Sequence, residues 1–105
     1  MKLVKAKKNL GQHFLTDLNI ARRIADTVDA CPDIPVLEIG PGMGVLTQYL
    51  VTKDREVKAV EIDKESVAFL HENYPELRDN IIGEDFLRMD LCKVFERRPF
   101  VLTGN

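Results

Sequence analysis

The fold of this chain is decided by one stretch of its sequence, Val36-Leu37-Glu38-Ile39-Gly40-Pro41-Gly42-Met43-Gly44. Its first four residues are mainly apolar and predict a short strand, which ends where the glycines begin. Apolar side chains with helical spacing follow directly, at Val45, Leu46, Tyr49 and Leu50. The stretch therefore predicts a strand, a glycine turn and a helix in that order.

Strands and helices continue to alternate on both sides of this unit. Further strands are expected over 57–63, 80–83 and 100–102, and a helix around 67–70 stops at Pro75. Before the unit, Thr16 is a good N-cap for an amphipathic helix that continues to Val28, with Leu15 and Ile20 placed as a hydrophobic staple. This alternation predicts a parallel sheet with right-handed crossovers, the doubly wound α/β class.

Composition limits the chain to one small globular unit. Its 105 residues provide a single core, and 45% hydrophobic with 30% charged residues is an ordinary globular composition. No apolar run is long enough to span a membrane and no secretory signal follows the first lysines, so a cytoplasmic location is expected. Cys31 and Cys92 belong to no metal-binding pattern, and we expect two buried or half-buried thiols and no metal site.

The net charge of -2 conceals a basic arm on an acidic body. The arm carries Lys2, Lys5, Lys7 and Lys8, whereas the rest of the chain has 11 basic and 17 acidic residues. Such a cluster can follow a phosphate backbone, which makes Lys5, Lys7 and Lys8 candidate RNA-binding residues. A short lysine cluster is as often a solvated terminus, so charge alone leaves both interpretations open.

Candidate ligand-binding residues fall at the carboxyl ends of the expected strands, where open parallel sheets bind ligands. Gly40, Gly42 and Gly44 allow a sharp turn and a close approach of the backbone to a ligand, and the following helix offers its amides. Glu61 follows by about 20 residues, inside the end of the second strand, where an acid can accept hydrogen bonds from both ribose hydroxyls. Capping of the next helix is the alternative role, and it suits Asp63 better. The pattern favours an adenosine-containing cofactor.

Two further observations refine the cofactor. A dinucleotide is disfavoured because the G-x-G-x-x-G fingerprint requires a glycine at position 45, where this chain has a valine. After the third strand, Asp85 could accept a hydrogen bond from an adenine amino group and Phe86 could cover the ring. Residue type alone leaves loop capping by Asp85 and core packing by Phe86 nearly as plausible.

The chain also carries four motifs in succession. They are Gly11-Gln12-His13-Phe14-Leu15, Glu38-Ile39-Gly40-Pro41-Gly42-Met43-Gly44-Val45-Leu46-Thr47, Val60-Glu61-Ile62-Asp63 and the closing Gly104-Asn105. Together they resemble the KsgA family of rRNA adenine dimethyltransferases, and the match covers nearly the whole chain. With Pro41, the glycine turn is more similar to this family than to the related resistance methyltransferases of the large-subunit rRNA.

This resemblance implies a partial Rossmann-like fold of the class I S-adenosylmethionine-dependent methyltransferases. It implies S-adenosylmethionine as cofactor and dimethylation of N6 of two adjacent adenosines in small-subunit rRNA, with that rRNA or the pre-ribosomal small subunit as partner. The family's cofactor-contacting positions fall on His13, Leu15, Gly40, Glu61, Asp85 and Asn105, to which the pattern adds Gly42 and Phe86. Asn105 is the expected catalytic residue, which would accept a hydrogen bond from the target amino group.

By the same resemblance, Asn105 is the first residue of an Asn-Leu-Pro-Tyr-like motif. We therefore expect a basic arm and cofactor-covering loop over 1–15, the N-terminal part of the methyltransferase domain over 16–105, and no catalysis by the chain alone. The uncovered fourth strand is expected to promote self-association. Three alternative functions remain open. They are a large-subunit rRNA methyltransferase, a nucleic-acid-binding relative without turnover and a nucleotide-dependent oxidoreductase.

Overall fold

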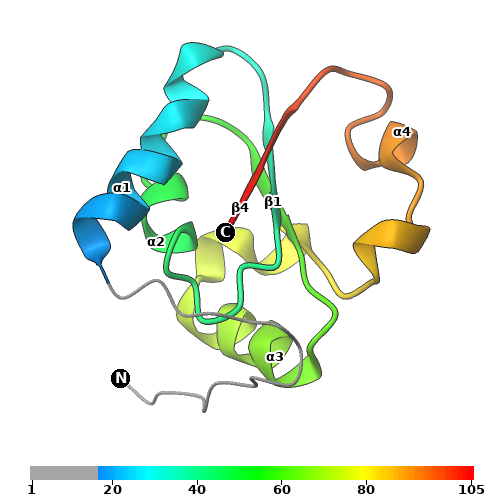
Figure 1. Ribbon diagram of the computed structural model, residues 1–105. Coiled ribbons are helices and arrows are strands. Elements are labelled where there is room, and N and C mark those ends of the chain that lie inside the picture. Colours follow the sequence, from blue (N-terminus) through cyan, green and yellow to red (C-terminus); the bar gives the residue numbers. More distant parts are fainter. Residues whose placement is uncertain (1–16) are drawn as a thin grey trace.

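Four short strands pair in parallel to form the centre of the molecule, as the computed structural model shows for residues 17–105 (Figure 1). They are β1 (Val36–Ile39), β2 (Val57–Val60), β3 (Ile81–Ile82) and β4 (Val101–Gly104), in the spatial order β3-β2-β1-β4. Each is separated from the next by helical structure, so parallel pairing follows from the crossovers. The predicted doubly wound α/β class is confirmed.

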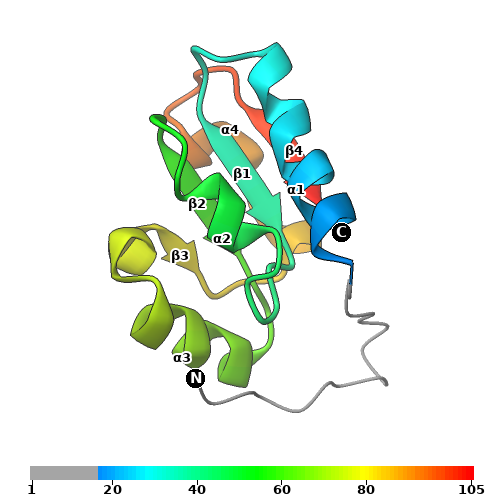
Figure 2. The same ribbon diagram turned by 90° about the vertical axis from the view of Figure 1, so that its left-hand side faces the viewer.

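One face of the sheet is covered by the helical segments α1 (Leu18–Asp26), η2 (Thr27–Ala30), α2 (Thr47–Leu50) and η3 (Pro75–Asn80). Small and branched side chains from these segments pack on alternate residues of the strands. The buried members of this first core cluster are Ala21, Ala25, Val28, Val36, Leu46, Leu50, Val57 and Leu77. In Figure 2, α2 lies in front of the sheet and α1 runs beside β4.

The opposite face is covered by η4 (Phe86–Arg88) and α4 (Leu91–Val94). Here the buried members are Leu37, Val60, Val94 and Phe95, which form the second core cluster. Val36 belongs to the first cluster and Leu37 to the second, because successive side chains of a strand point to opposite faces. The sheet is therefore the middle of three layers, and helix α3 (Lys64–Asn73) packs against β3 and η3.

The ends of several elements differ from those that the sequence predicts. Helix α1 begins after Asp17, whose carboxylate accepts hydrogen bonds from the N–H groups of Asn19 (2.9 Å) and Ile20 (3.3 Å). The cap predicted at Thr16 is therefore wrong by one residue, and the staple partner Leu15 lies outside the described residues. The strand predicted over 57–63 ends at Val60, so Glu61 stands just beyond the strand and not inside it.

The two cysteine side chains lie at the surface. Both thiols are exposed, so the prediction that Cys31 and Cys92 are buried or half-buried is wrong. Cys31 follows the 3₁₀ segment η2 and Cys92 lies on the short helix α4, and neither side chain reaches a core cluster. Within residues 17–105, no helix combines the length and the hydropathy that crossing a membrane requires.

Strand β4 lies at one edge of the sheet. Within the described residues it pairs only with β1, and the side chain of Leu102 is 48% exposed. Gly104 is needed here because a Cβ at this position would lie 2.8 Å from the carbonyl oxygen of Ile39. The self-association expected from this edge stays a prediction.

Candidate functional site

The carboxyl ends of three neighbouring strands come level at one edge of the sheet. Ile39, the last residue of β1, pairs with Val60 on one side and with Gly104 on the other. The residues that follow these three are Gly40, Glu61 and Asn105. The sheet therefore brings together the glycine turn, the candidate ribose ligand and the candidate catalytic residue, as the sequence predicts.

The glycine turn exposes bare backbone at this edge. Gly40 and Gly42 have φ angles of +62° and +55°, which L side chains rarely adopt. A Cβ at Gly40 would meet nothing within 4 Å, and one at Gly42 would meet only the Gly40 carbonyl oxygen at 4.0 Å. These two glycines therefore face open space, which is the arrangement that a closely approaching ligand requires.

The third glycine of the turn serves a different purpose. Gly44 has a φ angle of +83°, and a Cβ at this position would lie 2.7 Å from ring and hydroxyl atoms of Tyr74. Gly44 therefore accommodates a side chain of the protein itself. The sequence pattern treats the three glycines alike, and the structure separates them.

Glu61 lies beneath the turn with its carboxylate held at both oxygens. The side chain is 3% exposed; its Oε1 accepts a hydrogen bond from the N–H of Gly42 (2.8 Å), and its Oε2 accepts one from the N–H of Asp63 (3.0 Å). An ionised carboxylate has about four acceptor sites, so each oxygen keeps capacity for one hydroxyl group. Glu61 thus anchors the turn, and acceptance of hydrogen bonds from a ribose stays a prediction. The capping role falls to Asp63, which accepts a hydrogen bond from the N–H of Ser66 (3.0 Å) at the start of α3.

A second buried acid, Glu38, was not singled out as a site residue by the sequence. It lies in β1 on the face covered by α2, and its Oε1 accepts a hydrogen bond from the hydroxyl of Thr47 at 2.6 Å. Burial raises the pKa of Glu38 to about 7, against the lowering effect of the Thr47 hydrogen bond and with a smaller contribution from the nearby Glu61. The signal was available in the alternation of β1, which places this acid on the same face as Val36.

Asp85 and Phe86 take the roles that were the alternatives to cofactor binding. The Asp85 carboxylate caps η4 by accepting a hydrogen bond from the N–H of Leu87 (3.0 Å), and it lies 3.8 Å from the guanidinium of Arg88. Phe86 is half-buried against the second core cluster. Both stay on the carboxyl side of β3, so a cofactor contact by either residue stays a prediction.

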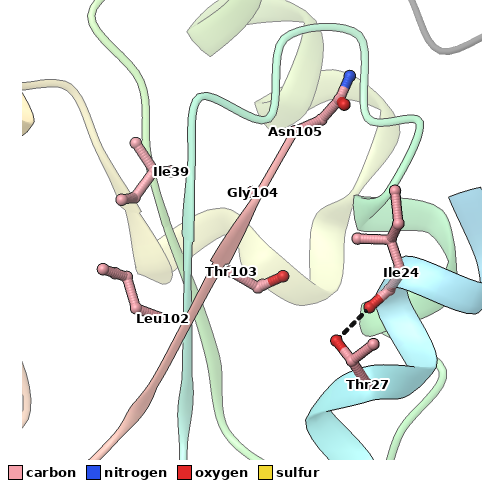
Figure 3. Close-up of a pocket in the computed structure, with 7 residues that line it drawn as sticks. All are labelled: Ile24, Thr27, Ile39, Leu102, Thr103, Gly104 and Asn105. Carbon is pink, nitrogen blue, oxygen red and sulfur yellow. Dashed lines mark hydrogen bonds between the residues drawn. The ribbon is translucent and has the colours of Figure 1, made fainter.

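Asn105 lines a cavity of about 570 Å³ between the end of β4 and helix α1 (Figure 3). Thr103 points toward Ile24 and Thr27 of the helical layer, whereas Ile39 and Leu102 point to the other side of the strand. The catalytic candidate thus borders a cavity on the β4 side of the turn. The glycines and Glu61 do not line this cavity.

An exposed apolar side chain beside Glu61 was also missed by sequence reasoning. Ile62 is 62% exposed, although it directly follows a residue that is 3% exposed. The candidates His13, Leu15, Lys5, Lys7 and Lys8 lie outside the described residues. Among residues 17–105 no group of His, Cys, Asp and Glu side chains is arranged to hold a metal ion.

Comparison of the sequence with known proteins identifies the family of this chain. Residues 3–105 match the family described as ribosomal RNA adenine dimethylase. The chain is 67% identical over its whole length to the ribosomal RNA small subunit methyltransferase A of Phocaeicola vulgatus and 54% identical to that of Flavobacterium johnsoniae. It spans 38% and 40% of the length of these two relatives.

Solved structures share the fold. The 23S rRNA methyltransferase ErmE is 37% identical with a TM-score of 0.70, over 88% of this chain and 36% of that one. The glycopeptide N-methyltransferase MtfA, solved with S-adenosylmethionine, is 29% identical with a TM-score of 0.56, over 70% of this chain and 35% of that one. The sheet is therefore that of the class I S-adenosylmethionine-dependent methyltransferases, and the chain belongs to the ribosomal RNA adenine dimethylase family.

Proposed function

We propose that this chain is the S-adenosylmethionine-binding part of a cytoplasmic enzyme that dimethylates N6 of two adjacent adenosines in small-subunit rRNA. One observation carries the proposal: Gly40 and Gly42 present bare backbone to open space directly beside the carboxylate of Glu61. A ribose can then be held by Glu61 while the rest of the cofactor passes close to the turn. The family match and the small-subunit names of the curated relatives support the proposed reaction and substrate.

Each described residue has a distinct task toward the cofactor. Glu61 accepts hydrogen bonds from the two ribose hydroxyls, and Ile62 offers an exposed apolar surface to the adenine ring. Asp85 would accept a hydrogen bond from the adenine amino group while it keeps the hydrogen bond that caps η4. A carboxylate has enough acceptor sites for both. His13 and Leu15 are proposed to cover the cofactor from the N-terminal segment.

On the acceptor side, Asn105 is proposed as the catalytic residue. S-adenosylmethionine supplies an electrophilic methyl group on its sulfonium. The lone pair of an adenine amino group is delocalised into the ring, so the site must align this nitrogen and accept hydrogen bonds from its hydrogens. The side-chain oxygen of Asn105 is the proposed acceptor of one of them, and the position of Asn105 at the end of β4, lining the cavity, supports this role.

A large-subunit rRNA target is the second candidate, and the similarity to ErmE favours it. The curated relatives named for the small subunit have higher identities, 54% and 67% against 37%. The small-subunit assignment is therefore the stronger one. An assay of methyl transfer to isolated small and large subunits separates the two.

The decisive experiment uses the gene product at its natural length. Isothermal titration with S-adenosylmethionine should show binding, and titration with NAD should show none, because the turn lacks the third glycine of the dinucleotide fingerprint. Transfer of a radiolabelled methyl group to small ribosomal subunits should follow. Binding of NAD without S-adenosylmethionine would refute the proposal, and cofactor binding without methyl transfer would favour the relative without turnover.

The basic arm gives a separate prediction. Replacing Lys5, Lys7 and Lys8 with alanine should weaken RNA binding and make it less dependent on salt. Each phosphate contact that is lost means that one counterion fewer is released when the protein binds RNA. Measuring RNA affinity between about 50 and 200 mM salt tests this, because complexes held by phosphate contacts weaken steeply over this range. Affinity for S-adenosylmethionine is the control and should stay unchanged. An unaltered salt slope would identify the arm as a solvated terminus.

A further inference from the structure

Tyr74 occupies a fixed point between two helical segments. It is the C-cap of α3, where its N–H donates to the carbonyl of Leu70 at 2.9 Å. Its own carbonyl accepts from the N–H of Leu77 in η3, also at 2.9 Å. The half-buried side chain packs against the first core cluster. Backbone hydrogen bonds therefore connect Tyr74 to both α3 and η3.

From this position the side chain reaches the glycine turn, 30 residues earlier in the chain. Its hydroxyl donates a hydrogen bond to the carbonyl oxygen of Gly44 at 3.2 Å. That oxygen also accepts a hydrogen bond from the N–H of Gln48 in α2 at 3.0 Å. Burial raises the pKa of Tyr74, with smaller contributions from Glu38 and Glu76, so its hydroxyl stays protonated and available as a donor.

The aromatic ring contributes as much as the hydroxyl. Ring atoms of Tyr74 lie 2.7 and 2.9 Å from the position that a Cβ on Gly44 would take. Contacts this short show that the ring fills the space where a side chain would be. Gly44 and Tyr74 are thus complementary, because a ring here requires a glycine opposite.

Within residues 17–105, the side chains of three residues outside the turn and α2 make hydrogen bonds that hold the turn. Glu61 accepts from the N–H of Gly42, and Glu38 accepts from the hydroxyl of Thr47, so two acids hold its middle and its end. Tyr74 holds the carbonyl between them. The two acids belong to β1 and the end of β2, and Tyr74 alone of the three connects the turn to the far end of α3.

We propose that Tyr74 is a positioning residue of the cofactor site, which sets the conformation of the glycine turn through its ring against Gly44 and its hydroxyl on the Gly44 carbonyl. The inference rests on the proposed function, since it assumes that S-adenosylmethionine binds beside Gly40 and Gly42. Tyr74 itself need not touch the cofactor. It acts by keeping the backbone of the turn in the shape that leaves these two glycines open.

The first test is Tyr74→Phe in the gene product at its natural length. This variant keeps the ring and loses the hydroxyl, so we expect S-adenosylmethionine affinity to fall about 2- to 10-fold, the range for one neutral hydrogen bond. The rate at saturating cofactor should stay unchanged, which separates positioning from catalysis. Tyr49→Phe is the matched control, because the Tyr49 hydroxyl makes no hydrogen bond within residues 17–105 and its ring packs on the same cluster.

A purely structural role predicts a different result. The melting temperature of Tyr74→Phe would fall while the affinity of the folded protein for S-adenosylmethionine stayed at the parental value, and this outcome would overturn the part of the inference that concerns the hydroxyl. The proposed function fails separately, if the parental protein does not bind S-adenosylmethionine at all. Parental binding together with unchanged binding by Tyr74→Phe rejects only the role of the hydroxyl in positioning.

A double-mutant cycle tests the contact between the ring and the glycine. Gly44→Ala should weaken cofactor binding in the parental protein, because the new methyl group meets the ring of Tyr74. The same change should weaken binding less in a Tyr74→Leu background, where no ring is present, although the strain at a φ of +83° remains. Equal losses in both backgrounds would show that the ring does not set the turn.

Discussion

Replacement of Glu61 with alanine is expected to weaken S-adenosylmethionine binding by about 1.5 to 3 kcal/mol, the range for hydrogen bonds to a charged group. This corresponds to a loss of roughly 10- to 150-fold in affinity. Two effects act in the same direction. The ribose loses its acceptor, and the N–H of Gly42 loses the carboxylate oxygen that holds it at 2.8 Å. Isothermal titration of the folded variant measures the change.

Two variants separate these effects. Glu61→Gln keeps an oxygen that can accept from Gly42 but removes the charge, so its affinity should lie between those of the parental protein and Glu61→Ala. Glu72→Ala removes an exposed carboxylate on α3 and should leave affinity unchanged. Parental affinity in a folded Glu61→Ala protein would remove Glu61 from the site.

The stability of the chain is expected to depend on pH through Glu38. Its pKa is raised from 4.5 to about 7 in the folded protein, so the folded state holds this proton more tightly than the unfolded state. The stabilisation is fully present below about pH 4.5 and is lost as the pH rises through about 7. A shift of this size corresponds to about 3 kcal/mol. Urea unfolding at pH 4 and pH 8 would measure it.

Glu38→Gln isolates this contribution. The amide keeps an oxygen that can accept the hydroxyl hydrogen of Thr47, and it carries no charge at any pH. We expect the variant to lack the Glu38 part of the pH dependence and to be more stable than the parental chain at pH 8. Glu72→Gln, an exposed position, should keep the parental dependence. If Glu38→Gln and the parental chain lose stability equally between the two pH values, Glu38 is not the group responsible.

The central strand-turn-helix unit could be predicted because local sequence determines it. Four mainly apolar residues followed by glycines with positive φ leave few alternatives for the chain between Val36 and Gly44. The ends of elements depended on single polar side chains and were less predictable. Asp17 rather than Thr16 caps α1, and β2 ends at Val60, directly before Glu61, whose carboxylate accepts a hydrogen bond from the N–H of Asp63.

The site was predictable in part for the same reason. Gly40, Glu61 and Asn105 could be predicted to lie at one edge of the sheet because each directly follows a strand, and strand ends meet by topology. Gly42 belongs to the turn that starts at Gly40. The roles of Glu38 and Tyr74 depend on contacts with residues that are distant in the sequence. Glu38 and Thr47 are 9 residues apart, and Tyr74 and Gly44 are 30 residues apart. No local pattern distinguishes such contacts from ordinary core packing. The exposure of Cys31 and Cys92 depends in the same way on which helix faces stay uncovered.

Because of the order of the strands, the two halves of the site differ in the entropy lost on loop closure. Val36 pairs with Val57 in β2, 21 positions later, and with Val101 in β4, 65 positions later. Closing the longer loop costs about 1 kcal/mol more, because this entropy grows with the logarithm of loop length. The pairing of β1 with β2, which aligns the glycine turn with Glu61, has the lower contact order. The half of the site that is proposed to hold the cofactor is therefore entropically easier to assemble than the half that presents Asn105.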